Sequence, residues 1–307
     1  MNFLKGLVLS LLSFLLFLSL SIFGIAFTVK STLLNPDFVV AEVNKLEVSS
    51  LARELIDKQL SEQLPQEAGF PQEIIKEAIY SVISDQEPWL KEQVSAAIYA
   101  GYDFLLGKSE RLELTISLEV LKESLRDSLW RTLTESLPLG LLGLPSDQIE
   151  PYFNQLYEEF AGQIPSEFEV DESYLPPEVM AQIIQVREGI SYFMLGYNIL
   201  IGFMVLLVLG VIFINRNIKS ITRGLGITLL TYGALEYAGV FAARYFAPVS
   251  LLMSETLAEI PSSLQMWLTG LFSDLLAPLE MFSLCCLVGG VVLIIASFVY
   301  RPRVAEE

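Results

Sequence analysis

Glu236 is the residue whose type and position in this sequence most directly suggest chemistry. It stands about twelve residues into an otherwise uncharged stretch, residues 224–243. A charge at the centre of a bilayer costs roughly 2.5–3.5 kcal/mol on insertion scales, so an acidic residue at that depth needs a partner or a function. At about 1.5 Å per residue along a helix, Asn198 and Ser21 reach a similar depth, and Tyr232 lies one turn away. The sequence therefore predicts an intramembrane polar site formed by Glu236, Asn198, Tyr232 and Ser21.

This predicted polar site has two interpretations, which the sequence leaves open. In the first, a protonated Glu236 joins a hydrogen-bonded network that locks the helices together. In the second, Glu236 binds a proton, a cation or a ligand, which is the default hypothesis for an acidic residue within a membrane. The first role is structural, whereas the second belongs to a transporter or a channel.

The stretch around Glu236 also carries small residues on two helical faces. Small side chains let neighbouring helices approach closely, so we expect this helix to stand at the centre of a bundle. Packing within the chain, rather than dimerisation, is the expected reason for these residues. One face contains Ala234, Ala238 and Ala242, and the other contains Gly233, Gly239 and Ala243.

Four stretches of the chain are long and apolar enough to cross a membrane, because a hydrocarbon core of about 30 Å needs about 20 helical residues. The first stretch follows Lys5 and lacks the short apolar region and small-residue cleavage site of a signal peptide, so we expect an uncleaved signal anchor. A long signal peptide cut near Ala26 is the alternative. The four stretches are residues 6–29, 190–214, 224–243 and 281–300.

Basic residues predict the orientation of these spans. The loop at residues 215–223 holds three basic residues and no acidic one, which by the positive-inside rule places it in the cytoplasm. Both termini are then inside, and residues 30–189 and 245–278 are outside. The basic residues that flank the inner side are Lys5, Arg216, Lys219, Arg223, Arg301 and Arg303, against Lys30, Arg187 and Arg244 on the outer side.

The segment predicted to be exported, residues 30–189, is strongly acidic. It contains 12 Lys and Arg residues and 29 Asp and Glu residues, which accounts for the whole net charge of −17. This charge argues against nucleic acid or anionic lipid as a partner of its surface. The segment has no cysteine and no Asn-x-Ser/Thr acceptor site, so we expect a prokaryotic envelope protein whose stability owes nothing to disulfides.

Several classes of chemistry are excluded or disfavoured by composition. The chain has no histidine, which excludes Ser-His-Asp, Cys-His and His-metal sites. It has no nucleotide-binding loop, and its acidic groups, such as Glu158-Glu159 and those between Glu167 and Glu172, lack calcium-loop spacing and indicate a solvated face. Cys285-Cys286 are expected to act as small apolar residues. We therefore predict no catalytic, cofactor-binding or metal-binding residue.

Periodicity in the exported segment predicts a mainly helical domain with one small sheet. Asn35-Pro36-Asp37 has the residue types of a capped helix start. Residues 112–118 alternate as a half-buried strand, for which Phe168-Glu169-Val170 is the expected partner in a hairpin-like sheet. From Pro176-Pro177 one continuous helix is expected to run into the membrane, so that movement of the domain is felt by the second span. Other expected elements are helices from Pro36 to about Leu64, at 72–84, 88–106, 119–136 and 146–160, a hydrophobic loop at 138–145, and an amphipathic helix after Pro261-Ser262.

These observations predict a mainly α fold: a four-helix transmembrane bundle with a large, mostly helical extracytoplasmic domain, containing a small two-stranded β element, between the first and second spans. The predicted segments are 1–30 (signal-anchor helix), 31–189 (acidic extracytoplasmic domain), 190–214 (second transmembrane helix), 215–223 (basic cytoplasmic loop), 224–244 (third transmembrane helix), 245–278 (extracytoplasmic amphipathic segment) and 279–307 (fourth transmembrane helix and cytoplasmic tail).

The expected function is that of a non-enzymatic interaction, scaffold or sensor module of the cell envelope, held in the plasma membrane by several spans with both termini in the cytoplasm. A transporter or channel subunit with a carboxylate site at Glu236 is the alternative, and a membrane enzyme comes third. The expected partners are the lipid bilayer and other membrane or envelope proteins, without nucleic acid or a cofactor. Homo-oligomerisation is left open.

Overall fold

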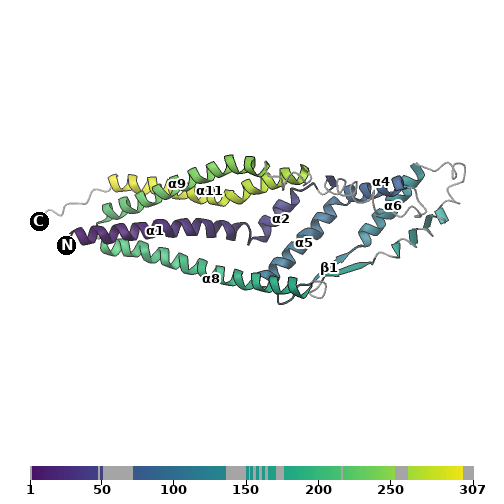
Figure 1. The fold of residues 1–307 in the computed structure, drawn as a ribbon, viewed down its shortest axis with the longest axis horizontal. Helices are drawn as coiled ribbons and strands as arrows, with labels where there is room; N and C mark the ends of the chain where they lie inside the picture. The colour runs from purple at the N-terminus through teal and green to yellow at the C-terminus, as the bar shows by residue number, and fades with distance from the viewer. Residues whose placement is uncertain are drawn as a thin grey trace. The chain divides into compact units, whose positions relative to one another are not determined.

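The computed structural model of the chain describes residues 2–47, 49–50, 72–135, 150–151, 153–154, 157–158, 161–162, 165–170, 176–215, 217–252 and 262–299. These residues are mainly helical and include one two-stranded sheet (Figure 1). The chain divides into two compact units. The bundle unit comprises residues 1–39, 186–260 and 265–307, and the acidic unit comprises residues 40–185 and 261–264.

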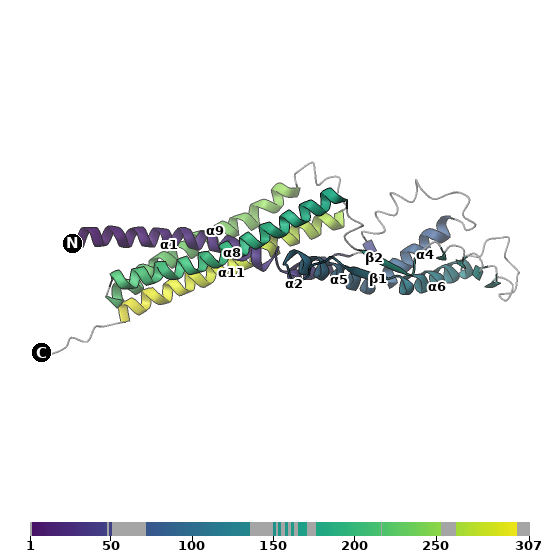
Figure 2. The same cartoon turned by 90° about the horizontal axis from the view of Figure 1, so that it is seen from below.

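Four long helices make up most of the bundle unit, and both views show them running alongside one another (Figure 1, Figure 2). They are α1 (Asn2–Ser31), α8 (Pro177–Ile214), α9 (Ile218–Leu252) and α11 (Ser262–Val299). Each is long and apolar enough to cross a membrane. The prediction of four potential membrane-spanning helices is therefore confirmed.

The helices α8 and α9 both extend beyond the apolar stretches from which they were predicted. The helix α8 begins at Pro177 and is continuous, as the sequence predicted. Proline suits the first turn of a helix, because a backbone nitrogen there makes no hydrogen bond within the helix. The helix α9 begins six residues earlier than its apolar stretch, at Ile218. Asn217 caps it, since the side-chain Oδ1 accepts a hydrogen bond from the Lys219 backbone N–H at 3.1 Å.

The helix α11 joins two segments that the sequence analysis separated. It runs from Ser262 through Pro278 to Val299, whereas the sequence predicted an exterior helix and a distinct span from residue 281. A proline inside a helix removes one backbone hydrogen bond and crowds the preceding turn. The helix nevertheless continues through it. Five residues before Pro278, the Ser273 carbonyl oxygen accepts a hydrogen bond from the Arg244 Nη2 of α9 at 3.0 Å.

The core of the bundle unit receives side chains from all four helices. Its buried cluster consists of Leu16, Leu20, Leu207, Tyr232 and Cys286. Large apolar side chains also face outward, among them Phe213, which is 77% exposed. A helix that is apolar on all sides is typical of a membrane span, because lipid chains cover the outward face.

The backbones of α9 and α11 approach each other closely within the bundle unit. A Cβ atom added at Gly233 would lie 2.5 Å from the Leu287 nitrogen and 2.6 Å from the Ser283 carbonyl oxygen. One added at Gly290 would lie 2.5 Å from the Leu230 nitrogen and 2.8 Å from the Gly226 oxygen. The two backbones therefore touch at positions where only glycine fits. We call this contact the glycine seam: Gly226, Gly233 and Gly290, with Ser283 opposite Gly233.

The glycine seam uses only part of the small-residue pattern on α9. Gly233 lies in it, as expected for a packing face, but a Cβ atom at Gly239 would meet no atom within 4 Å. The other predicted face, Ala234, Ala238 and Ala242, is exposed. α9 nevertheless contacts both α11, through the seam, and α1, through Tyr232 and Phe17.

The acidic unit contains short helices and the small sheet. Gly107, with a φ of 74°, follows the end of α5, where a left-handed conformation favours glycine. The predicted helices at 72–84, 88–106 and 119–136 are confirmed. The described elements are α4 (Gln72–Asp85), α5 (Glu87–Leu105), β1 (Leu114–Ser117), α6 (Glu119–Glu135) and β2 (Glu167–Val170).

The two strands pair as the sequence predicted. β1 and β2 are antiparallel, with Ile116 opposite Phe168 and Leu114 opposite Val170. The element is not a tight hairpin, because α6 lies between the strands in the sequence. A period-two pattern identifies a half-buried strand wherever its partner stands in the chain, so the pairing was predictable while the connection was not.

The predicted helix from Pro36 to about Leu64 is wrong in its length. Its start is confirmed, since Asn35 Oδ1 caps α2 (Pro36–Asn44) by accepting from the Asp37 N–H at 3.2 Å. α2 ends at Asn44, where Lys45 and Leu46 donate to carbonyls three residues back, at 3.1 and 3.0 Å. Such hydrogen bonds to the carbonyl three residues back, as in a 3₁₀-helix, are common at the C-terminal end of an α-helix. Residues 51–64 and the predicted loop at 138–145 lie outside the described residues, as does part of the predicted helix at 146–160.

A polar and aromatic contact joins α6 to the segment around Phe153. Phe153 is only 2% exposed and packs with its ring centroid 5.0 Å from that of Trp130. The Tyr157 hydroxyl donates to the Lys122 carbonyl oxygen at 2.6 Å. Burial raises the pKa of Tyr157 above its ordinary value, so this hydroxyl keeps its proton at neutral pH.

The glycine seam makes a testable prediction. Gly233→Ala should destabilise the bundle by about 1–3 kcal/mol, because a methyl group would force the α9 and α11 backbones apart. Gly239→Ala is the matched control on the same helix, and it should leave stability unchanged or raise it by at most about 1 kcal/mol, since alanine favours helix. Thermal unfolding in detergent compares the two. Equal melting of both variants would mean that the helices do not touch at Gly233.

Candidate functional site

Tyr232 lies at the centre of the predicted polar site and is the most deeply buried of its residues. It is 1% exposed. Its ring packs edge-on against Phe17 of α1, with centroids 6.1 Å apart and an interplanar angle of 81°. It packs similarly against Phe282 of α11, at 5.9 Å and 61°. Such edge-to-face pairs match the charge distribution of aromatic rings and hold Tyr232 in one position.

The Tyr232 hydroxyl points at the backbone of α1. It lies so close to Gly24 that a Cβ atom there would collide with it. Among the described residues the hydroxyl has no hydrogen-bond partner. A buried polar group without a partner is costly and rare. Tyr232 therefore fills space between three helices while leaving one polar atom unsatisfied.

Glu236 follows Tyr232 by one turn of α9, so the two side chains are neighbours on one helical face. The Glu236 side chain is partly buried. No hydrogen bond connects it to Tyr232, whose hydroxyl lacks a partner in the described part of the chain. The structure thus places a phenol and a carboxyl group on adjacent turns within an apolar span.

Asn198 and Ser21 are not joined to this pair by hydrogen bonds in the described residues. The Asn198 side chain is exposed on α8. The Ser21 hydroxyl donates to the carbonyl oxygen of Phe17, in its own helix, at 3.2 Å. Counting residues gives a depth along the helix axis but not a face, and a serine in a helix commonly bonds to its own backbone. A ligand site made of all four residues stays a prediction.

An aromatic layer surrounds Tyr232 toward the end of the bundle unit that contains Lys30. Phe23 of α1 stacks on Tyr197 of α8, with ring centroids 5.4 Å apart, and contacts Phe282 of α11 at 5.3 Å. The Lys30 Nζ lies 4.4 Å from the centroid of the Tyr197 ring, within the range of a cation–π contact. This layer was not predicted from the sequence, although Phe23 and Phe27 stand one helical turn apart.

Arg244 of α9 and Glu280 of α11 form an ion pair that the sequence analysis also missed. Both side chains are about one-third exposed, at 31% and 32%. Side chains lean toward the N-terminus of their own helix. Because α9 and α11 run in opposite directions, Arg244 and Glu280 lean toward each other. Arg244 also holds the Ser273 carbonyl near Pro278, so one guanidinium ties α9 to both sides of the proline in α11.

The described residues offer no site for a metal ion. Within them, no three His, Cys, Asp or Glu side chains gather closely enough to hold one. The acidic side chains Glu158, Glu167 and Glu169 are exposed. Cys285 is exposed and Cys286 is buried, and both are free thiols.

The geometry therefore offers one buried phenol beside a carboxyl group, one interhelical ion pair and a layer of aromatic rings, all within the bundle unit. No protein-family model, curated protein or solved structure matches the chain.

Proposed function

We propose that this chain is a non-enzymatic interaction, scaffold or sensor module of the cell envelope, anchored by its four-helix bundle in the plasma membrane. In this proposal the acidic segment, residues 31–189, is extracytoplasmic and both termini are cytoplasmic. The partners are the surrounding lipid and other membrane or envelope proteins of a prokaryotic cell.

The packing around Tyr232 is the observation that carries this proposal. Conduction or transport requires a pathway lined by polar groups or water. At the level of Glu236 the rings of Phe17, Tyr232 and Phe282 occupy the space between α1, α9 and α11. Among the described residues, aromatic rings that pack against one another between the helices leave no polar pathway through a single chain at this level. This packing therefore supports a membrane anchor rather than a transporter.

Charge supports an interaction role for the acidic segment. Residues 30–189 contain 12 Lys and Arg residues and 29 Asp and Glu residues, which accounts for the whole net charge of −17. A segment with a large net negative charge attracts basic partners and accelerates their association. Salt reduces this acceleration. A sensor function would use α8, whose unbroken helix from Pro177 to Ile214 includes residues of both units.

The proposed topology is tested by labelling single cysteines. With Cys285 and Cys286 replaced by alanine, Ser166→Cys should react with a membrane-impermeant maleimide applied to intact cells, and Ser220→Cys should react only after the cells are opened. The prediction follows from the positive-inside rule applied to the basic loop at 215–223. Reaction of the Ser220 variant from outside, with protection of the Ser166 variant, would show that the chain is inverted.

A transporter or channel subunit built around Glu236 is the second candidate. The observation in its favour is that Glu236 and the unpartnered Tyr232 hydroxyl stand on adjacent turns within an apolar span. Ionisable residues in such spans often mark proton or ion pathways. Because aromatic rings occupy the space between α1, α9 and α11 at the level of Glu236, this candidate requires a pathway formed between several copies.

Glu236→Gln separates the two candidates. Glutamine keeps the size of glutamate but cannot ionise. For an anchor, liposomes containing the wild-type chain should pass protons and monovalent cations no faster than empty liposomes, and the variant should melt like the wild type. Flux through the wild type that is lost in Glu236→Gln, with unchanged melting, would contradict the scaffold proposal and support the transporter. Leu235→Gln, at the neighbouring position, is the control for the effect of placing a glutamine side chain at that depth in the membrane.

A further inference from the structure

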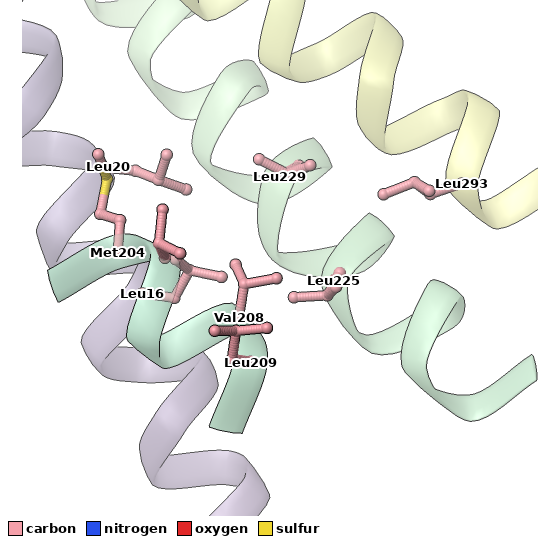
Figure 3. A pocket seen from close by; sticks show the side chains of 9 residues that line it. Leu16, Leu20, Met204, Val208, Leu209, Leu225, Leu229 and Leu293 are labelled. Carbon is pink, nitrogen blue, oxygen red and sulfur yellow. The ribbon is translucent and has the colours of Figure 1, made fainter. Parts of the chain in front are cut away.

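An apolar cavity opens between α1, α8 and α9 of the bundle unit. Its volume is about 390 Å³. Figure 3 shows the side chains of α1 and α8 facing those of α9 across it, with Leu293 of α11 at the far side. Its principal lining residues are Leu16, Leu20, Met204, Val208, Leu225 and Leu229.

The lining of this cavity specifies a hydrocarbon occupant. Every lining side chain is aliphatic or a thioether. A buried water needs two to four polar partners, which such a lining does not offer. Val205 and Leu209 at the lining are 54% and 42% exposed, so the cavity opens at the outer surface of α8. In helices that span a membrane, that opening faces the hydrocarbon of the bilayer.

Basic residues near the start of α9 indicate the charge of the lipid head group. Leu225 stands six residues after Lys219, about 9 Å along the axis of α9. The exposed side chains of Lys219 and Arg223 both belong to this first part of α9, and residues 215–223 contain no acidic residue. Basic groups at the cytoplasmic end of membrane helices attract anionic lipid head groups.

We propose that this cavity binds one anionic phospholipid of the cytoplasmic leaflet, with an acyl chain between Val208 and Leu229 and the phosphate at Lys219 and Arg223. The proposal rests on the membrane topology proposed above. The acyl chain packs against the apolar lining of the cavity. The phosphate carries the negative charge that complements the basic residues of the loop, which contains no acidic residue.

Lipid retained by the purified full-length chain tests the acyl-chain half of the site. The protein is equilibrated in mild detergent with phosphatidylglycerol or phosphatidylcholine, and the lipid-bound fraction is measured by native mass spectrometry. Val208→Phe and Leu229→Phe fill the cavity and should reduce bound phosphatidylglycerol about tenfold. Leu206→Phe and Leu235→Phe are controls, since these side chains are 65% and 61% exposed and do not line the cavity. Equal retention in all four variants would overturn the proposal.

The head-group half is tested by removing charge. The double variant Lys219→Gln and Arg223→Gln should lower the preference for phosphatidylglycerol over phosphatidylcholine roughly tenfold, because each basic residue near a membrane surface contributes to binding anionic lipid. Lys108→Gln with Arg111→Gln, in the acidic unit, should leave that preference unchanged. An undiminished preference in the first double variant would overturn the assignment of the phosphate.

Cross-linking of the wild type covers the case in which a cavity-filling variant fails to fold. A phosphatidylglycerol with a photoreactive group in the middle of its acyl chain should label peptides containing residues 204–209 and 225–229. Labelling spread evenly over the four helices would contradict the site. Cysteine labelling at Ser220 decides the topology separately. If that topology holds and the wild type retains no phosphatidylglycerol, the result counts against the lipid site alone.

Discussion

Backbone contact between α9 and α11 is the constraint on which the bundle unit depends. Lipid surrounds apolar helices as favourably as other helices do, so association within a membrane relies on close packing and interhelical polar contacts. The glycine seam brings the two backbones together at Gly226, Gly233 and Gly290. Along the same pair of helices, Arg244 bonds to Glu280 and to the Ser273 carbonyl. Both kinds of contact therefore act on one helix pair, and Tyr232 joins α1 to it.

The sequence predicted those elements whose signal is local. Length and apolarity predicted the four long helices, because any such stretch must satisfy its backbone within a helix. Alternation predicted β1 and its partner β2, and Pro176-Pro177 predicted the start of α8. Asn35 correctly marked the start of α2, although the end of that helix at Asn44 was missed. The membrane orientation and the outward location of the acidic segment stay predictions.

The sequence did not predict contacts that depend on which helical faces meet. Depth counting grouped Asn198 and Ser21 with Glu236, and that grouping stays a prediction. In the described residues Asn198 is exposed and Ser21 bonds to its own helix. The pairing of Arg244 with Glu280 was hidden because the two charges were assigned to the ends of separate spans. The continuity of α11 through Pro278 was not predicted either, because a proline inside a helical pattern usually ends or kinks the helix. The ion pair is a tertiary contact, which no local pattern in the sequence indicates.

Substitution of two adjacent glycines of α11 tests the central claim most directly. A Cβ atom at Gly290 would lie 2.5 Å from the Leu230 nitrogen, whereas one at Gly289 would meet no atom within 4 Å. Gly290→Ala should therefore lower the melting temperature of the purified protein in detergent, because the backbones of α9 and α11 must separate to admit the methyl group. Gly289→Ala should not lower it. Equal melting of the two variants, or a loss of stability in Gly289→Ala alone, would contradict this account of the bundle.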